Sequence, residues 1–368
     1  MARRLEQYFK RLTLALLKGL ISSKRPLDLA TRTFKRILII RQHDQLGDML
    51  CVVPLLRGIR QRYPDAFIAL MTSPVNHDVM LNNPYVDQLF QYDKREFLGG
   101  AWIRWGRLVS FLKFLRREDF ELVIVPTTVS TSVTSDLLAY LSGAAYRIGA
   151  GEIDDVVNRS GLFFNCPVTL HWGETSHRHQ SLRNLDIAHD LWLNVTDLSS
   201  EIGLTEQEKE EATVFAAANH LIPGAFISFH PGAGKLPNRW EAGRFASVAA
   251  KLHSEFRSAI VITRGSMDDD PVGEMQSKLE IPHQLIENKS IRQVAAILFL
   301  AQLVISNDTG IMHVAAAVGT PVLSLFGPTD PEQWAPIGTK HRYIVGKDGD
   351  INSIGTDEVL KVAREMLR

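Results

Sequence analysis

The sequence predicts an α/β protein built from two Rossmann-like domains, and three observations support this fold class. Short apolar runs alternate with helical stretches from Phe34 onward, which is typical of parallel sheets covered by helices. The alternation restarts near Ala225 after an acidic stretch, so the chain contains two similar halves. The length of 368 residues fits two domains, because one domain commonly spans roughly 100–200 residues.

The first half begins with a strand that is apolar throughout, ILII at 37–40, as expected of a strand buried on both faces of a parallel sheet. Apolar residues then recur with helical spacing, and further short apolar runs follow. We expect strands at 37–40, 67–71, 121–125 and 147–149, helices at 47–63, 101–117, 133–141 and 177–193, and an extended crossing at 197–203 before an acidic helix at 206–219.

The second half repeats this order. We expect strands at 225–230, 259–263, 303–306 and 322–326, and helices at 241–256, 272–279, 291–301, 310–318 and 357–367. The pattern leaves open whether the last helix crosses back to the first half. Expected boundaries are therefore 1–35, 36–200, 201–350 and 351–368, with two Rossmann-like domains facing each other across a cleft and ligands at the carboxyl ends of the strands.

Composition excludes several classes of protein. The chain has 41 Lys+Arg and 41 Asp+Glu and is 45% hydrophobic, so it lacks the low hydrophobicity and high net charge of disordered proteins. Cys51 and Cys166 are too few for a disulfide scaffold and indicate a reducing compartment. No apolar run reaches 18 residues, which excludes a membrane-spanning helix. We expect a cytoplasmic protein without a nucleic-acid partner.

Two stretches combine basic and apolar residues. Residues 1–36 carry ten basic and two acidic side chains, with apolar residues at helical spacing. In the 101–117 helix an apolar stripe that starts at Trp102 and Trp105 is flanked by arginine and lysine. Such helices bind anionic membrane surfaces, although both could also pack on the protein. Peripheral attachment to the inner face of the inner membrane is one expectation.

The polar turn after the first strand is the first candidate site. It runs RQHDQLGD from 41 to 48 and includes His43 and Gly47. Asp48 begins the next helix, where a carboxylate can take a proton from a substrate hydroxyl. Helix capping is the alternative role for Asp48. In the same half, Thr127 and Thr128 follow the 121–125 strand and could bind an acceptor sugar or simply cap a helix.

Two further turns follow strands of the second half. HPGAGKLPNRW at 230–240 contains Gly232, Ala233, Gly234, Lys235 and Arg239. Small residues let backbone N–H groups approach an anion, and the two cations add positive charge, although a tight turn alone would explain the glycines.

The last of these turns is SNDTGIMH at 306–313, which opens an apolar helix at Thr309 and Gly310. Free N–H groups at such a helix start suit a diphosphate. Asp308 and Thr309 are also ordinary capping residues.

Two acidic or histidine-rich clusters are poor metal sites. The triplet Asp268–Asp270 precedes a helix, where acids favour the positive end of the helix dipole. His171, His177 and His179 with Glu174 fit no standard zinc spacing. We expect no metal.

Taken together, three segments of the chain resemble glycosyltransferase family 9, the ADP-heptose:lipopolysaccharide heptosyltransferases. The segments are ILIIRQHDQLGDMLCVVPLLRGIRQRYPDA, HPGAGKLPNRW and SNDTGIMHVAAAVGTPVLSLFGPTDP. Two further segments, LSGAAYRIG and HQSLRNLDIAHDL, are similar to segments at the same places in the family. The resemblance covers roughly residues 36–340.

The resemblance implies a GT-B fold and an inverting, metal-independent transferase without a cofactor. Its substrates would be a nucleotide-sugar donor, ADP-heptose, and a lipid-linked glycan acceptor. The acceptor domain would be 36–200 and the donor domain 201–350.

The family pattern also implies roles for individual residues. Asp48 would be the general base, and the turn at 232–235 with the backbone at Thr309 and Gly310 would hold the diphosphate. Asp308 would lie by the donor sugar, His313 by the leaving group and His179 on the acceptor side.

One position departs from the family pattern, and other functions stay open. Asn238 stands where members often have lysine, and either Lys235 or Arg239 could replace the charge. Alternatives are a GT-B transferase or epimerase that uses a UDP- or GDP-sugar, and a non-catalytic two-domain binding protein.

Overall fold

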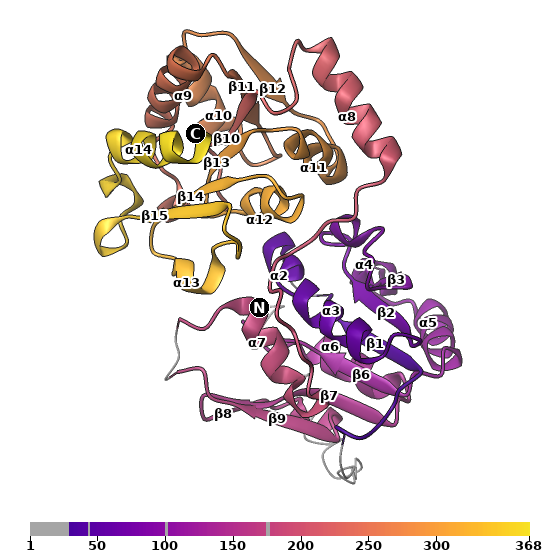
Figure 1. The fold of residues 1–368 in the computed structure, drawn as a ribbon. Coiled ribbons are helices and arrows are strands. Elements are labelled where there is room, and N and C mark those ends of the chain that lie inside the picture. The colour runs from indigo at the N-terminus through magenta and orange to yellow at the C-terminus, as the bar shows by residue number, and fades with distance from the viewer. Residues whose placement is uncertain (1–28, 43–44, 100–101, 174–176) are drawn as a thin grey trace. The chain divides into compact units, whose positions relative to one another are not determined.

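The computed structural model describes residues 29–42, 45–99, 102–173 and 177–368, which form two α/β units (Figure 1). Contacts among these described residues assign those within 29–42, Pro54–His77 and Pro84–Asp197 to unit 1, and those within Gln45–Val53, Asp78–Asn83 and Leu198–Arg368 to unit 2. The predicted class, two parallel-sheet α/β domains, is confirmed. Two short segments of the first half nevertheless group with unit 2.

Unit 1 is built on a sheet of seven strands among its described residues. The order is β3-β2-β1-β6-β7-β8, with β9 also on β7, and every pair except β7–β8 is parallel. The apolar runs of β1 and β6 lie at the centre, because they are buried on both faces. The strands are β1 (Arg36–Ile40), β2 (Phe67–Thr72), β3 (Gln88–Gln91), β6 (Leu122–Val125), β7 (Tyr146–Ile153), β8 (Val156–Val157) and β9 (Cys166–Leu170).

The single helix predicted at 47–63 is wrong. The chain forms α2 (Leu46–Leu50) and α3 (Val53–Arg62), separated at Cys51 and Val52. Pro54 has no N–H to donate to the carbonyl of Leu50, so a continuous helix would lose a hydrogen bond there. The Ser200 hydroxyl donates to the Leu50 carbonyl instead, at 2.9 Å.

Other helices of unit 1 are shorter than predicted. The helix expected at 101–117 is α5 (Trp105–Arg117), because β4 (Leu98–Gly99) and β5 (Trp102–Ile103) pair as a hairpin before it. The helix expected at 177–193 is α7 (Gln180–Ile187) followed by a short 3-10 turn, His189–Leu191. The remaining helices are α4 (Lys94–Phe97) and α6 (Val133–Leu141).

Unit 2 has a six-stranded sheet in which all the pairs are parallel, in the order β12-β11-β10-β13-β14-β15. Its strands are β10 (Phe226–His230), β11 (Ala259–Thr263), β12 (His283–Ile286), β13 (Leu303–Asn307), β14 (Val322–Phe326) and β15 (His341–Val345). Besides α2, its described helices are α8 (Glu206–Ala218), α9 (Ala242–Phe256), α10 (Asp269–Lys278), α11 (Ile291–Phe299), α12 (Gly310–Ala317), α13 (Pro331–Trp334) and α14 (Thr356–Leu367).

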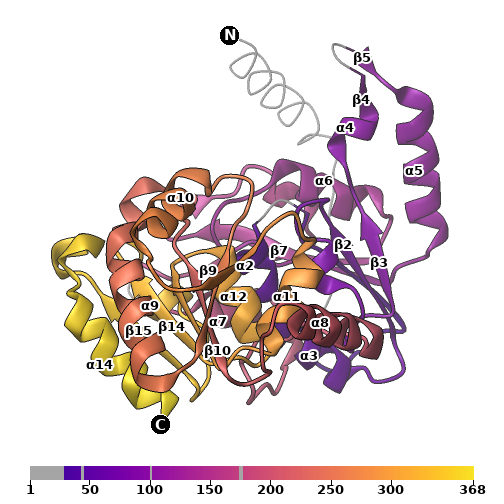
Figure 2. The same ribbon diagram turned by 90° about the horizontal axis from the view of Figure 1, so that it is seen from above.

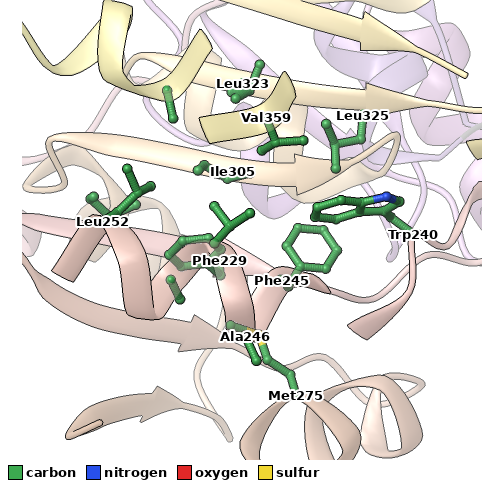
Figure 3. Close-up of a cluster of buried hydrophobic side chains, with 14 of the residues drawn as sticks. Phe229, Trp240, Phe245, Ala246, Leu252, Met275, Ile305, Leu323, Leu325 and Val359 are labelled. Atoms are coloured by element: carbon green, nitrogen blue, oxygen red, sulfur yellow. The ribbon is translucent and has the colours of Figure 1, made fainter. Parts of the chain in front are cut away.

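The core of unit 2 fixes the loops that follow β10 and β13. Trp240 and Phe245 meet edge to face, with ring centroids 4.9 Å apart, beside Phe229 of β10 (Figure 3). Val359 and Leu360 bring α14 into the same core, where it lies beside α9 (Figure 2). The last helix therefore packs on unit 2, although the sequence left open its return to the first half.

Candidate functional site

Three loops of unit 2 leave the same edge of its sheet. Strands β10, β13 and β14 are neighbours, with His230 opposite Ser306 and Asn307 opposite Leu325. Because the strands are parallel, the loops after their carboxyl ends, 231–239, 308–309 and 327–330, start side by side. This is the edge of an α/β sheet at which ligands bind.

The glycine-containing loop after β10 is held by two buried side chains that the motif did not suggest. The Asn307 amide donates to the carbonyls of Pro231 (2.9 Å) and Gly232 (3.2 Å). A Cβ added at Gly232 would lie 2.0 Å from Oδ1 of Asp268, so only glycine fits there. Asp268 also accepts the Gly265 N–H at 2.8 Å. Asp268 thus supports the loop.

The cations of this loop have different surroundings. The Arg239 guanidinium donates to the carbonyl of Ala233 at 2.8 Å, so this side chain bonds to its own loop. Lys235 and Gly234 are exposed at the tip. Lys235 is the cation that an incoming anion would meet first, and its charge opposes the rise that burial causes in the pKa of Asp308.

Asn238 joins the other two loops. Its Nδ2 donates to Oδ2 of Asp308 and to Oγ1 of Thr329, both at 3.0 Å. Gly327 makes this approach possible, because a Cβ there would lie 2.7 Å from the carbonyl oxygen of Pro237. Burial raises the pKa of Asp308, while the hydrogen bond with Thr329 and the Lys235 charge oppose that rise. The residue that departs from the family pattern therefore orients a carboxylate.

Helix α12 opens beside Asp308. Thr309 is its N-cap, and the Thr309 hydroxyl accepts the N–H of Ile311 at 3.2 Å. Gly310 is the first residue of this eight-residue helix, whose other first-turn N–H groups have no partner within the helix itself. The positive end of the helix dipole and these donors suit a phosphate group.

Helix α2 packs on α12 inside unit 2. A Cβ on Gly47 would lie 2.6 Å from Cδ2 of buried His313, and one on Gly310 would lie 3.3 Å from Cβ of Leu46. Asp48 is half-buried at the third position of α2, where its carboxylate accepts the Gln45 N–H at 3.3 Å in a capping box. Asp48 therefore does cap its helix, from inside the helix rather than at the N-cap, and it belongs to the same unit as the loops after β10, β13 and β14.

The predicted acceptor-side residues are divided between the two units. Thr127 and Thr128 are buried after β6 in unit 1, where Thr128 accepts from the buried Arg41 guanidinium at 3.4 Å. His179 caps α7 through its Nδ1, which accepts the Ser181 N–H at 3.1 Å. Gly47 is in unit 2. His43 lies outside the described residues.

The fold and the site together define a class of protein. The chain has two parallel-sheet units, and the loops at the carboxyl edge of the unit 2 sheet suit a diphosphate. This is the GT-B fold of nucleotide-sugar enzymes. Comparisons with known proteins specify the family. The model of glycosyltransferase family 9 (heptosyltransferase) matches residues 108–360. The chain belongs to this family, and it is a glycosyltransferase.

Individual relatives agree with this assignment. The chain is 26% identical to lipopolysaccharide heptosyltransferase 2 of Escherichia coli, over 84% of this chain and 87% of that one. The glycosyl transferase family 9 structure from Veillonella parvula superposes with a TM-score of 0.75 at 23% identity, over 94% of this chain and 99% of that one. The Escherichia coli heptosyltransferase WaaC with ADP gives 0.71 at 18% identity, over 90% and 99%.

Proposed function

We propose that this glycosyltransferase moves a heptose from ADP-heptose to a lipopolysaccharide core acceptor, with inversion at the anomeric carbon and without a metal. The observation that carries the proposal is the packing of α2 on α12, which brings the helix of Asp48 against the helix whose N-terminus suits a phosphate. The relatives support the substrates, because they are lipopolysaccharide heptosyltransferases and one was solved with ADP.

The donor diphosphate would be held by backbone groups and one exposed cation. The N–H groups of Thr309 and Gly310 and the turn at 232–235 supply hydrogen bonds, and Lys235 supplies charge. Asp308, oriented by Asn238, would accept hydrogen bonds from the donor sugar. These groups stabilise the charge that develops on the leaving ADP, which is the main requirement of a transfer without a metal.

In the reaction, Asp48 takes the proton of an acceptor hydroxyl. The oxygen forms a bond to the anomeric carbon on one face, while the bond to the diphosphate oxygen breaks on the opposite face and ADP leaves with that electron pair. Attack opposite the leaving group inverts the configuration through an oxocarbenium-like transition state. His313, beside Gly47, would lie near the leaving group.

Replacement of Asp48 by asparagine tests this mechanism. Because a general base contributes about 10²–10⁴-fold, Asp48→Asn should lower kcat by that factor while ADP binding stays unchanged. The measurements are transfer to a delipidated core acceptor and calorimetry with ADP. Asp357→Asn, at an exposed first turn of α14, is the matched control.

Two outcomes would contradict the proposal. Full turnover by Asp48→Asn would show that Asp48 is not the general base. Tighter binding of UDP or GDP than of ADP would favour the alternative in which another nucleotide sugar is the donor.

We also propose that the protein works on the cytoplasmic face of the inner membrane, where a lipid-linked acceptor is presented. The basic stretch at 1–35 supports this location, although most of it lies outside the described residues.

A further inference from the structure

Helix α5 of unit 1 presents one face to its own core and another to solvent. Leu115 is fully buried, and the Phe111 ring packs between those of Tyr92 and Phe97 at 5.6 and 5.3 Å. Trp105 and Val109, by contrast, are 64% and 45% exposed. The apolar stripe predicted from the sequence therefore splits: its middle covers the core, and its edge remains exposed.

Basic residues share this exposed edge. At about 100° per residue, Trp105, Val109, Lys113 and Arg116 fall within an arc of about 80°. Arg116 bonds to the backbone, donating from Nε to the Leu141 carbonyl at 3.1 Å. An exposed tryptophan and valine thus lie among cations on one side of the helix.

The cations of α5 form no ion pairs among the described residues. Arg104, at the N-cap, and Arg107, Lys113, Arg116 and Arg117 are all exposed, and the helix itself contains no acid. None of the five forms an ion pair with any carboxylate in the part of the chain that the structure describes. Arginines elsewhere do form ion pairs, as those of Arg36–Glu118, Arg60–Asp87, Arg178–Asp186 and Arg364–Glu255 show.

We propose that this edge of α5 is a docking surface for a bilayer of anionic phospholipids. Trp105 and Val109 enter the boundary between headgroups and acyl chains, and Lys113 and Arg116 beside them bind the headgroup phosphates. Tryptophan favours this boundary, where its ring is apolar and its N–H stays hydrated, and long basic side chains reach the headgroups from beside it. Charge complementarity selects an anionic surface.

Docking through α5 deepens the proposed function, since it would bring unit 1 to a lipid-linked acceptor. It also stands apart from that function, because binding to vesicles requires no turnover. Within the described residues no helix is long and apolar enough to cross a bilayer, so α5 would lie on the surface.

The test is co-sedimentation of the full-length protein with vesicles of phosphatidylglycerol and phosphatidylethanolamine, or of phosphatidylcholine alone. We expect the wild type to bind the anionic vesicles at least tenfold more strongly, and to be released by 0.5 M salt. The variants Trp105→Ser and Lys113→Glu/Arg116→Glu should each weaken binding about tenfold. Because residues 1–35 stay intact in them, any loss belongs to α5.

Matched controls use residues of similar exposure away from α5. Trp192→Ser removes a tryptophan that is 78% exposed in the same unit, and Lys361→Glu reverses an exposed charge on α14. Both should bind vesicles like the wild type. Circular dichroism melts should show that all variants remain folded, because every substituted side chain is exposed.

Three results would overturn the proposal: no binding by the wild type, equal binding by the α5 variants, or binding that 0.5 M salt does not change. Loss of binding to single-stranded RNA in the same variants, without vesicle binding, would assign the surface to nucleic acid.

Transfer to a delipidated acceptor should be unchanged in the α5 variants. A wild type inactive in that assay would contradict the proposed function but leave the docking surface untouched.

Discussion

Asn238 shows how one neutral side chain can organise the loops at the edge of a sheet. Its amide uses both hydrogens, one on Asp308 and one on Thr329, and so ties the loops after β13 and β14 to the loop after β10. A lysine at this place would add a positive charge, whereas the neutral asparagine orients the Asp308 carboxylate without adding charge. Lys235 is then the cation placed to meet the diphosphate, because Arg239 is bonded to the Ala233 carbonyl.

Removal of this amide should change the pH dependence of the reaction. Hydrogen bonds from N–H groups favour an ionised carboxylate, so Asn238→Ala should raise the pKa of Asp308 further. We expect the acid limb of kcat/KM for the donor to move to higher pH, with about a tenfold loss at neutral pH, because a hydrogen bond to a charged group contributes about 1.5–3 kcal/mol. A pH–rate profile measures both effects.

The hydroxyl partner provides the control for this prediction. Thr329→Val should shift the acid limb in the same direction, and Thr329→Ser should restore it. An acid limb that stays in place in Asn238→Ala would show that Asp308 is not titrating in the profile.

At the scale of elements, the contact between α2 and α12 depends on two glycines. Gly47 and Gly310 allow the helices to approach until Gly47 meets the ring of His313 and Gly310 meets Leu46. The Leu50 carbonyl at the other end of α2 is fixed by Ser200. The spacing between Asp48 and the start of α12 is therefore set by helix packing inside unit 2.

Gly47→Ala should separate these helices. The new methyl would overlap the His313 ring, and overpacking of this kind costs about 1–3 kcal/mol. We expect a drop of about 10–100-fold in kcat/KM together with a lower melting temperature, measured by transfer assays and calorimetry.

Gly273→Ala is the matched control, since a Cβ on this helical glycine meets nothing within 4 Å and should leave activity unchanged. The double variant Gly47→Ala/His313→Ala should lose less than the two single variants predict together, because the alanine relieves the overlap. Strict additivity would mean that the two residues are not in contact.

A second arrangement of elements centres on Arg292 of α11. Its side chain is buried and pairs with Glu208 of α8, and it also donates to the carbonyls of Gly203, Asp78 and Leu81 at 2.7, 3.1 and 3.1 Å. This guanidinium explains why Asp78–Asn83, a segment from the first half of the sequence, groups with unit 2.

At the scale of the whole molecule, two carboxylates with large pKa shifts, Glu208 in unit 2 and Asp136 in unit 1, couple stability to pH with opposite signs. The Arg292 guanidinium lowers the pKa of Glu208 to about 2, so its contribution is complete above pH 4.5 and disappears as the pH falls toward 2. Burial raises the pKa of Asp136 to about 6, so the folded state holds its proton more tightly than the unfolded chain. Unit 1 should therefore lose stability as the pH rises from about 4 to 6.

Asp136→Asn should remove the loss of stability that unit 1 shows as the pH rises. Ser160 and Asn158 both donate to Oδ2 of Asp136, at 2.5 and 3.0 Å, so an amide oxygen in its place can accept both hydrogen bonds. At pH 7 we expect the variant to be more stable by about 2–3 kcal/mol, the equivalent of a shift of two pKa units. Urea unfolding at pH 4 and pH 7 measures the difference, and equal stabilities of variant and wild type at both pH values would contradict it.

The sequence predicted the central strands because they are mostly apolar: β1, β6, β10, β13 and β14 lie where the apolar runs are. It missed the edge strands β3, β12 and β15, and also β8 and β9, which form the other edge of the unit 1 sheet. Edge strands pair on one side only and carry polar residues, as QLFQ, HQLI and HRYIV do, so their pattern resembles that of a loop. They are recognisable only when the partner strand is in place.

For the candidate site, the sequence identified the loops and their family but not how they are supported. The motifs supplied Asp48, the 232–235 turn and the 308–313 helix start. They gave no sign that Asn307 and Asp268 hold the turn, that Thr329 shares Asn238, or that buried Arg41 lies on Thr128. Each of these contacts joins residues far apart in the sequence.

The sequence by itself determined that this chain has two α/β domains with polar turns at the ends of its strands, because apolar periodicity and turn residues act over a few neighbouring positions. The glycosyltransferase family followed from the resemblance of its three motifs. Only the tertiary structure decided that α2 packs on α12, that α14 belongs to unit 2 and that α5 leaves a basic, apolar edge in solvent. Those outcomes depend on which surfaces of distant elements pack together. Local sequence patterns do not specify that packing.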